Sequence, residues 1–372
     1  MSRRPRGRPP AARLRVVLAP NSFKGTFDAV AVAEAWRGAL ATLPGVVPVL
    51  RPMGDGGDGF LAVVRRYRPH VLEVAARVPD PLGRPVAAAW GWDPGARAAY
   101  LESAAAIGLG RMAAEERRPL EADSAGLGRL LATAAGIGVR RFLIGLGGSA
   151  TVDGGLGMAR ALGFRFEDAR GRAIGGPGSL ERLARIHPPV APPLGKGARV
   201  TALADVESPL LGPSGAAAVF GPQKGADPEA VARLEAGLAR LAERWVADLG
   251  APTGLPEARG AGAAGGLGAG SVAFLGAQLA SGAAWCARLA GLGPALAGAD
   301  LVLTGEGSYD AQSGAGKATG YVVARARRAR VPAEVLDGGA LEGARPGAQL
   351  TLDDLGALAR LTVERFGART RS

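Results

Sequence analysis

The sequence has a single cysteine, Cys286, among its 372 residues, which excludes an intrachain disulfide and suits a reducing compartment. It also lacks any apolar run long enough to cross a bilayer as a helix. The first apolar stretch, residues 14–18, is too short and too charged for the core of a signal peptide. We therefore expect a cytoplasmic protein. A chain of this length that is 48% hydrophobic can form two domains with cores of their own.

Lysine is also scarce, because only four of the 45 basic residues are lysine and the rest are arginine. The ammonium of lysine is compact, whereas the guanidinium of arginine is a planar fork, so the retained lysines are candidates for sites that require the smaller group. Lys24, Lys224 and Lys317 stand in polar, glycine-flanked motifs and fit this interpretation. Lys196 lies in a proline-rich loop and is expected at the solvent surface.

The net charge of +12 is concentrated at the N-terminus, where the first fifteen residues contain six arginines and no acidic residue. Residues 1–13, rich in arginine and proline, are predicted to be a disordered basic tail. Residues 5–9 read Pro-Arg-Gly-Arg-Pro, which resembles the core of an AT-hook, an arm that enters the minor groove of DNA. A single copy in a tail favours a solvated leader, so we do not expect a nucleic-acid partner.

The segment after the tail predicts a parallel α/β sheet, because strands and helices alternate along it. The expected elements are strands at 13–20 and 46–50 and helices at 28–43 and 60–67. In such sheets ligands bind at the carboxyl ends of the strands, where this chain carries two polar loops. The second loop holds Asp55 and Asp58 among glycines. Such carboxylates can bind Mg²⁺ or accept a proton from an attacking hydroxyl, although a solvated turn has the same composition.

A change of pattern near residue 68 predicts a second domain. Short strands separated by proline and glycine turns, typical of an antiparallel arrangement, are expected at 71–78, 86–92 and 97–101. Alternation of strand and helix resumes at a buried strand over 300–304. We therefore predict an α/β protein in which residues 14–67 and 288–372 form a parallel, Rossmann-like domain. Residues 68–287 are expected to form an α/β domain with a mixed sheet, inserted in the first.

Residues 145–157, which read GLGGSATVDGGLG, are the most distinctive stretch. Apolar runs on its two sides predict a strand before it and a helix after it. Glycines remove Cβ atoms from the path of a ligand, and the N–H groups of such a turn favour an anion such as phosphate. The candidate contacts are Gly147, Gly148, Ser149 and Thr151, with Asp153 facing a metal or a sugar-like hydroxyl. An ordinary tight turn is the alternative.

Two later segments carry related features. A third glycine-rich loop at 259–270, which includes Gly265 and Gly266, again opens a helix. The buried strand at 300–304 is followed by a second charged rim. The charged members of that rim are Glu306, Asp310 and Lys317.

Six blocks in this order resemble bacterial glycerate kinases of the glycerate 2-kinase type, over roughly residues 14–330. The blocks are APNSFKGT, PMGDGGDG, GLGGSATVDGG, SPLLGPSGAAAVFGPQKGA, GAGAAGGLGAG and LTGEGSYDAQSGAGK. The resemblance implies transfer of the γ-phosphate of ATP to D-glycerate with Mg²⁺, usually giving 2-phosphoglycerate. It also implies two α/β domains, one inserted in the other, with the active site in the cleft between them.

Under this hypothesis the candidate residues supply what phosphoryl transfer requires, namely positioning and neutralisation of charge. Asp55 or Asp58 is expected as base or metal ligand, and Asp205, at the end of a strand over 199–204, as a second metal ligand. Lys24 and Asp310 complete the expected catalytic set. The expected substrate and phosphate contacts are Ser22, Gly147, Gly148, Ser149, Thr151, Asp153, Lys224, Gly265, Gly266, Glu306 and Lys317.

The chain departs from the residues usual in that family at several positions. Asn21 stands for Asp, Val152 for Asn, Asp58 for Glu, and Ser308 for Arg. The missing arginine removes a clamp for phosphate or carboxylate. The sequence therefore leaves open a kinase of another small hydroxy acid, a catalytically impaired paralogue, or a DNA-associated protein. It is compatible with a homodimer and does not choose between 2- and 3-phosphoglycerate as product.

Overall fold

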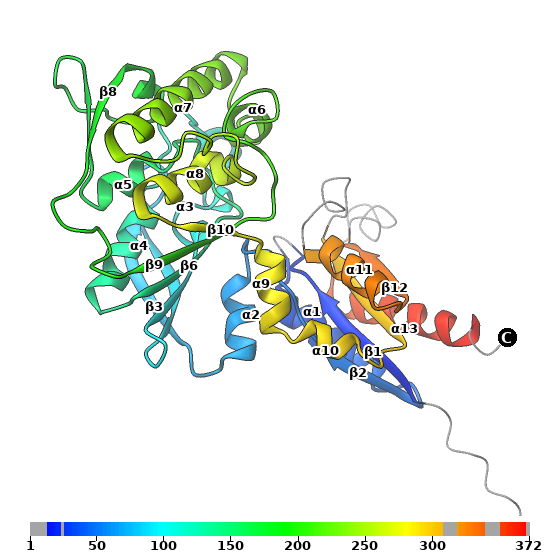
Figure 1. Ribbon diagram of the computed structural model, residues 1–372. Helices are drawn as coiled ribbons and strands as arrows, with labels where there is room; N and C mark the ends of the chain where they lie inside the picture. The colour runs from blue at the N-terminus through cyan, green and yellow to red at the C-terminus, as the bar shows by residue number, and fades with distance from the viewer. Residues whose placement is uncertain (1–12, 24–25, 308–317, 339–349, 370–372) are drawn as a thin grey trace, which may run out of the picture. The chain divides into compact units, whose positions relative to one another are not determined.

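The chain divides into two compact units, which we call the split unit and the inserted unit (Figure 1). The split unit comprises residues 1–53 and 287–372, and the inserted unit comprises residues 54–286. The computed structural model describes residues 13–23, 26–307, 318–338 and 350–369. Within these ranges no helix is both long enough and apolar enough to cross a membrane.

The split unit is built on a four-stranded sheet in the order β12-β11-β1-β2, and every neighbouring pair is parallel. The strands are β1 (Leu14–Pro20), β2 (Val46–Leu50), β11 (Leu301–Glu306) and β12 (Ala333–Asp337). Val16 of β1 pairs with Leu301 of β11, so the late strand joins the early ones, as the sequence predicted.

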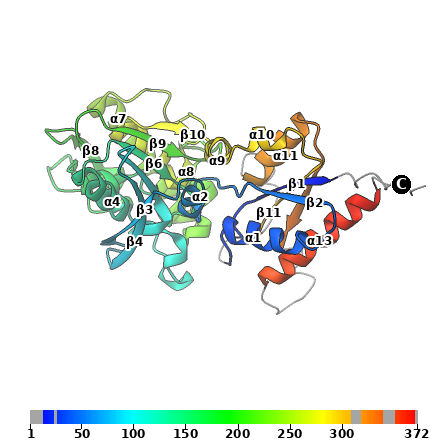
Figure 2. The same cartoon turned by 90° about the horizontal axis from the view of Figure 1, so that it is seen from below.

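Helices cover both faces of this sheet (Figure 2), which explains why β1 and β11 are almost continuously apolar. On one face lie α1 (Ala29–Leu40) and α13 (Leu352–Arg369), and on the other α10 (Leu292–Leu296) and α11 (Ala318–Arg328). Helix α1 begins where its sequence indicates, because the Asp28 carboxylate accepts hydrogen bonds from the N–H groups of Val30 and Ala31.

The inserted unit is built on a six-stranded mixed sheet in the order β10-β9-β6-β5-β4-β3. Its strands are β3 (Leu72–Pro79), β4 (Pro85–Asp93), β5 (Ala98–Glu102), β6 (Arg141–Gly145), β9 (Arg199–Leu203) and β10 (Gln278–Ala280). The first three strands in sequence pair antiparallel, and β5, β6, β9 and β10 pair parallel. Strands β7 (Arg165–Asp168) and β8 (Leu183–His187) form a separate antiparallel pair. The predicted α/β class with an inserted mixed sheet is thus confirmed.

Seven α-helices in the described ranges lie within the inserted unit, and an eighth, α9 (Gly282–Leu289), begins in it and ends in the split unit. The seven are α2 (Phe60–Tyr67), α3 (Ser103–Ile107), α4 (Ala125–Gly136), α5 (Leu156–Ala161), α6 (Ala216–Phe220), α7 (Pro228–Leu249) and α8 (Ala263–Leu275). Because α2 packs on β4 and β5, the first crossing between units follows Met53, whereas the sequence placed it near residue 68.

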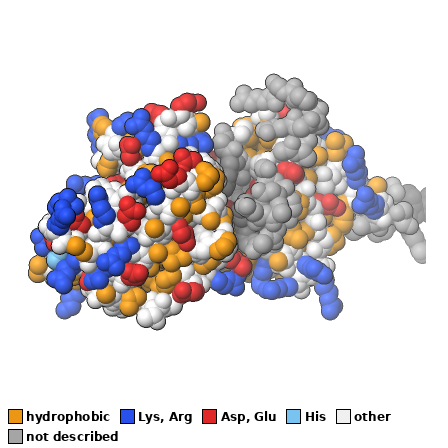
Figure 3. Space-filling model, turned by 90° about the horizontal axis from the view of Figure 1, so that it is seen from above, with side chains coloured by type: hydrophobic (Ala, Val, Ile, Leu, Met, Phe, Trp, Pro, Cys, Tyr) orange, Lys and Arg blue, Asp and Glu red, His pale blue; other side chains and the backbone are white. Residues whose placement is uncertain are grey.

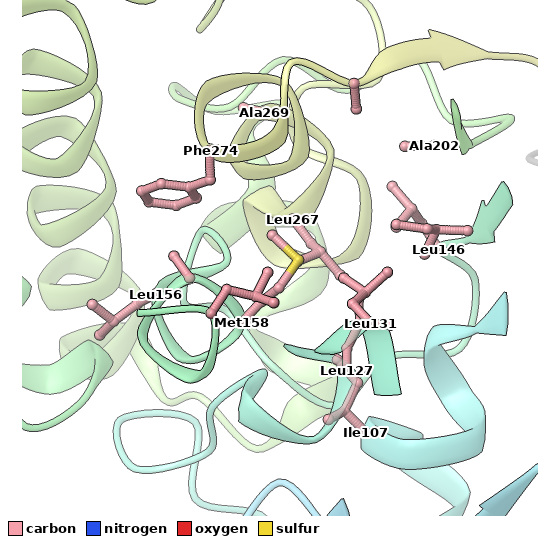
Figure 4. Close-up of a cluster of buried hydrophobic side chains, with 14 of the residues drawn as sticks. Ile107, Leu127, Leu131, Leu146, Leu156, Met158, Ala202, Leu267, Ala269 and Phe274 are labelled. Atoms are coloured by element: carbon pink, nitrogen blue, oxygen red, sulfur yellow. The ribbon is translucent and has the colours of Figure 1, made fainter. Parts of the chain in front are cut away.

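The core of the inserted unit holds the ends of the glycine-rich stretch in place (Figure 4). Leu146 enters this stretch and Leu156 leaves it, and both side chains are buried in the same apolar cluster as Met158 and Leu267. Packing in the core therefore holds both ends of the glycine-rich stretch, residues 145–157, in place.

On the face seen in Figure 3, basic, acidic and apolar side chains are interspersed over the larger unit.

Trp36 provides a test of the split unit's core. It is fully buried on α1, in the cluster that joins this helix to β1, β11 and α13. We expect Trp36→Ala to lower the free energy of unfolding by about 3–5 kcal/mol, since it leaves a large cavity. Denaturant unfolding measures this, with Leu361→Ala on the exposed side of α13 as the control. Equal losses in the two variants would contradict the packing described.

Candidate functional site

Four parallel strands of the inserted unit end level with one another. Glu102 of β5 pairs with Gly145 of β6, Gly145 with Leu203 of β9, and Leu203 with Ala280 of β10. The segments that follow these residues therefore leave the sheet at one edge. In parallel sheets this carboxyl edge is where ligands bind.

The loop at residues 54–59, which we call the aspartate loop, lies directly on this edge. Gly147 donates its N–H to the carbonyl of Gly56 at 3.3 Å. A Cβ placed on Gly145 would lie 2.1 Å from the same carbonyl oxygen, so only glycine permits this approach. Gly56 itself has a φ of +82°, which favours glycine again. The structure thus brings together the aspartate loop and the glycine-rich stretch, which the sequence indicated only separately.

Asp55 and Asp205 form a pair of interacting carboxylates. Asp205 follows β9, and its Oδ1 accepts from the Ser281 hydroxyl at 2.6 Å and its Oδ2 from the Ala283 N–H at 2.8 Å. Burial, with a smaller contribution from the charge of Asp55, raises the pKa of Asp205 to about 7. Asp55 accepts the Gly57 N–H on Oδ1 at 2.9 Å.

This pair fits a magnesium ion that also binds phosphate oxygens. Mg²⁺ is usually held by one or two carboxylates together with water and substrate phosphates. Across the described ranges, no group of three or more His, Cys, Asp or Glu side chains could hold a metal by itself. The negative charges of the two carboxylates repel each other, and a divalent cation bound by both would remove this repulsion. The two carboxylates therefore suit the expected Mg²⁺ ion.

Asp58 and Glu102 form a second acidic pair at the same edge. A Cβ on Gly148 would lie 3.2 Å from an Asp58 carboxylate oxygen, so Asp58 lies against the glycine-rich stretch. Burial, with the charge of Asp58 adding to it, raises the pKa of Glu102 to about 7. Glu102 accepts the Leu61 N–H at 2.7 Å and so fixes the start of α2. It therefore anchors the helix that follows the aspartate loop.

Lys224 supports the glycine-rich stretch from within. Its side chain is only 3% exposed, and Nζ donates to the Ser149 hydroxyl at 3.2 Å and to the Thr151 carbonyl at 2.8 Å. Burial lowers the pKa of Lys224 to about 7, although the charge of Asp153 acts in the opposite direction. The structure thus brings Lys224, Ser149 and Thr151 together.

Asp153 is fully buried, and its carboxylate is surrounded by donors. It accepts from the N–H and hydroxyl of Ser124 at 2.9 and 2.7 Å, from Gly155 N–H at 3.0 Å and from Gly157 N–H at 2.9 Å. The sequence expected this residue to face a metal or a hydroxyl of the ligand. In the structure its hydrogen bonds close the turn into α5.

The third glycine-rich loop packs on the first. Gly154 donates to the carbonyl of Gly265 at 3.1 Å, and a Cβ on Gly265 would lie 2.0 Å from the carbonyl oxygen of Thr151. A Cβ on Gly266 would lie 3.1 Å from Gly154 Cα. Both glycines adopt positive φ, so this loop shapes the glycine-rich stretch through backbone contacts.

The remaining predicted residues belong to the split unit. Ser22 is buried just after β1, and Glu306 is buried at the end of β11. These two residues lie at the carboxyl ends of paired strands, because Pro20 pairs with Gly305. Lys24, Asp310 and Lys317 lie outside the described residues.

Sequence reasoning missed two residues that support the aspartate loop. Ser281 donates to Asp205 and accepts the Ala284 N–H at 3.0 Å, so it caps α9. A Cβ on the next residue, Gly282, would lie 2.2 Å from the Asp55 carbonyl oxygen. The only signal was a Ser-Gly pair before a helix, which is too common to single out. Cys286 is buried, and burial raises the pKa of its thiol.

A comparison with known protein families shows which family the chain belongs to. A model of the glycerate kinase family matches residues 16–365, which is nearly the whole chain. The chain belongs to the glycerate kinase family. The predicted resemblance is therefore confirmed.

Curated members of the glycerate kinase family are similar along most of their length. The glycerate 2-kinase of Escherichia coli is 39% identical over 310 residues, 82% of this chain and 80% of that protein. A glycerate kinase of Bacillus subtilis is 38% identical over 322 residues, 86% of this chain and 83% of that protein. A crystal structure titled as a putative glycerate kinase 2 from Salmonella typhimurium superposes with a TM-score of 0.77 at 35% identity, covering 97% of this chain and all of that one.

The contact of the two glycine-containing loops can be tested at Gly147. A Cβ there would lie 2.6 Å from Gly57 Cα, so Gly147→Ala should displace the aspartate loop. We expect kcat/KM for glycerate phosphorylation to fall by about 100-fold, because small misplacements of catalytic groups have effects of this size. The control is Gly136→Ala in α4, where a Cβ would meet nothing within 4 Å. Unchanged activity in Gly147→Ala would exclude the loop contact as a functional requirement.

The buried amine of Lys224 predicts a pH dependence of stability. Its pKa is lowered in the folded protein, from 10.5 to about 7, so between these values the unfolded chain binds more protons. The free energy of unfolding of the wild type should therefore rise with pH from about 7 to 10, relative to Lys224→Met, and then level off. Denaturant unfolding of both proteins at several pH values measures the difference. A difference that falls over this range would show that Lys224 is not held largely neutral.

Proposed function

We propose that this member of the glycerate kinase family is a glycerate 2-kinase, which transfers the γ-phosphate of ATP to D-glycerate and forms 2-phosphoglycerate. The similarity to the glycerate 2-kinase of Escherichia coli supports the reaction class. The observation that carries the proposal is the seating of the aspartate loop on the glycine-rich stretch, at the carboxyl edge of the inserted unit's sheet. This seating places carboxylates beside backbone N–H groups.

The glycine-rich stretch is proposed to bind phosphate. Gly147 and Gly148 have no side chains that would obstruct a ligand, and a turn of this kind presents N–H groups to an anion. Ser149 and Thr151 are held in place by Lys224. Because Lys224 is buried and engaged by both, we assign it to the support of the phosphate-binding turn. Asp153 has the same supporting role through its four donors.

The carboxylates are proposed to handle the metal and the proton. Asp55 and Asp205 would hold Mg²⁺, which when bound neutralises charge on the transferring phosphoryl group. Asp205 is already oriented by Ser281 and the start of α9. Asp58, against Gly148, would orient the glycerate hydroxyl and accept its proton.

The split unit is proposed to supply the remaining contacts to substrate. Ser22, just after β1, and Glu306, the last residue of β11, lie at the carboxyl edge of its sheet. Lys24, Asp310 and Lys317, which follow these strands in the sequence, would add the charges that hold phosphate and carboxylate. These assignments follow the polarity of the sheet, since ligands of α/β units bind at this edge.

The identity of the product tests the proposal directly. Incubation with D-glycerate, ATP and Mg²⁺ should release ADP and give 2-phosphoglycerate, identified by NMR. Formation of 3-phosphoglycerate would retain the kinase and change the acceptor carbon. Turnover of a different hydroxy acid, with none of D-glycerate, would contradict the substrate assignment.

Asp55→Asn tests the proposed role of the aspartate loop. The amide has the shape of the carboxylate but lacks its charge, so we expect kcat to fall by about 10²–10⁴-fold with the fold intact. Circular dichroism and thermal unfolding check the fold, and a coupled ADP-release assay measures turnover. Asp227→Asn is the matched control, because Asp227 caps α7 and asparagine caps helices equally well. Wild-type turnover in Asp55→Asn would remove this residue from the mechanism.

A further inference from the structure

Asn21 stands at the carboxyl edge of the split unit's sheet, in a position that no assigned role explains. It directly follows β1, and its N–H donates to the Gly305 carbonyl at 2.8 Å, which continues the parallel ladder with β11. Its side chain is on the sheet face that also carries Thr304 and Glu306, since residues that pair in a parallel register share a face. Asn21 and Glu306 are therefore neighbours at this edge.

Helix α11 covers the same face. It packs on β11, β12 and β1, and its buried residues Thr319, Val322 and Ala326 recur at helical spacing on the side toward the sheet. Strands β11 and β12 are parallel neighbours and α11 lies between them in the sequence. The helix must therefore run back against the strands, which brings its first turn, with Thr319, to the carboxyl edge.

Two polar groups at this place have no hydrogen-bond partner among the residues that the structure describes. The Asn21 side chain is 2% exposed and its Nδ2 is unpaired, and Thr319 is fully buried with its Oγ1 unpaired. Thr304, on the same face, shows the ordinary situation, because its hydroxyl donates to the Ala19 carbonyl at 2.8 Å. Buried polar groups are normally paired, and leaving one unpaired costs free energy of folding. Within the described ranges, the folded chain therefore provides no hydrogen-bond partner for either group.

We propose that Asn21 and Thr319 form a binding site for an oxygen atom of a bound substrate, next to the N-terminus of α11. The inference rests on the proposed kinase function and names part of its substrate site. An amide, a hydroxyl and the N–H groups of a helix start are all donors, so they select a carboxylate or phosphoryl oxygen. That oxygen belongs either to the hydroxy acid or to the nucleotide.

The test compares two isosteric variants with a matched control. Asn21→Leu and Thr319→Val each remove an unpaired group, so the melting temperature of the ligand-free protein should stay the same or rise. Thr304→Val removes a paired hydroxyl and should lower it. Kinetics with D-glycerate and with ATP varied in turn should show a rise of about 3- to 10-fold in one KM for the first two variants, the size expected for one hydrogen bond. Thr304→Val should leave both KM values unchanged.

The pattern of the KM values identifies the ligand. A rise in KM for D-glycerate alone assigns the site to the carboxylate of the acceptor, and a rise for ATP alone assigns it to a phosphoryl group. Thr319→Ser keeps the hydroxyl and should restore the wild-type value. Unchanged KM values for both substrates overturn the proposal. A rise accompanied by a fall in melting temperature as large as that of Thr304→Val also overturns it, because general disruption would then explain the effect.

Failure of this inference is distinguishable from failure of the proposed function. If the wild type does not phosphorylate D-glycerate, the same variants are examined by thermal shift with ATP and with D-glycerate separately. A stabilisation of the wild type by one of these ligands that is reduced in Asn21→Leu and Thr319→Val would support the site. An equal shift in all proteins, or none in any, would reject it.

Discussion

The close approach of two backbones at the carboxyl edge of the inserted unit's sheet is the constraint on which the candidate site depends. The carbonyl of Gly56 lies where a side chain on Gly145 would begin, and Gly57 lies where one on Gly147 would begin. Glycine loses more conformational entropy on folding than other residues, so glycines on both sides of a contact indicate that the two backbones must approach closely. This approach forms a surface of backbone N–H groups with carboxylates beside it.

That surface carries an electrostatic cost that the fold only partly offsets. Glu102 and Asp205 are buried deeply enough for their pKa values to rise to about 7, and each is also affected by the charge of a neighbouring aspartate. Their hydrogen bonds to α2 and α9 hold them in place without supplying positive charge. A divalent cation would relieve this repulsion, which is consistent with the proposed magnesium site.

Much of the fold could be predicted from the sequence, but only where the signal lies within one short segment. The strands β1, β6, β9 and β11 are short apolar runs ended by glycine or polar residues, and each was placed correctly from that pattern alone. The strand β10 has three residues and no such signal, so it was missed together with the Ser281 contact that follows it. The assignment of α2 to the inserted unit also depends on packing between segments distant in sequence, which no local pattern records.

Hydrogen-bond accounting separates the residues that build the site from those that remain available to a ligand. Lys224 was identified by the scarcity of lysine, yet its amine is buried and donates to two acceptors of the glycine-rich stretch. Asp153 is likewise saturated by donors. Asn21 and Thr319, which are equally buried, have polar atoms with no partner among the described residues. Residue type and motif could not distinguish these two classes, because both contain the polar residues that a sequence pattern selects. The distinction follows only from whether the described part of the folded chain already satisfies each group, which no local sequence pattern records.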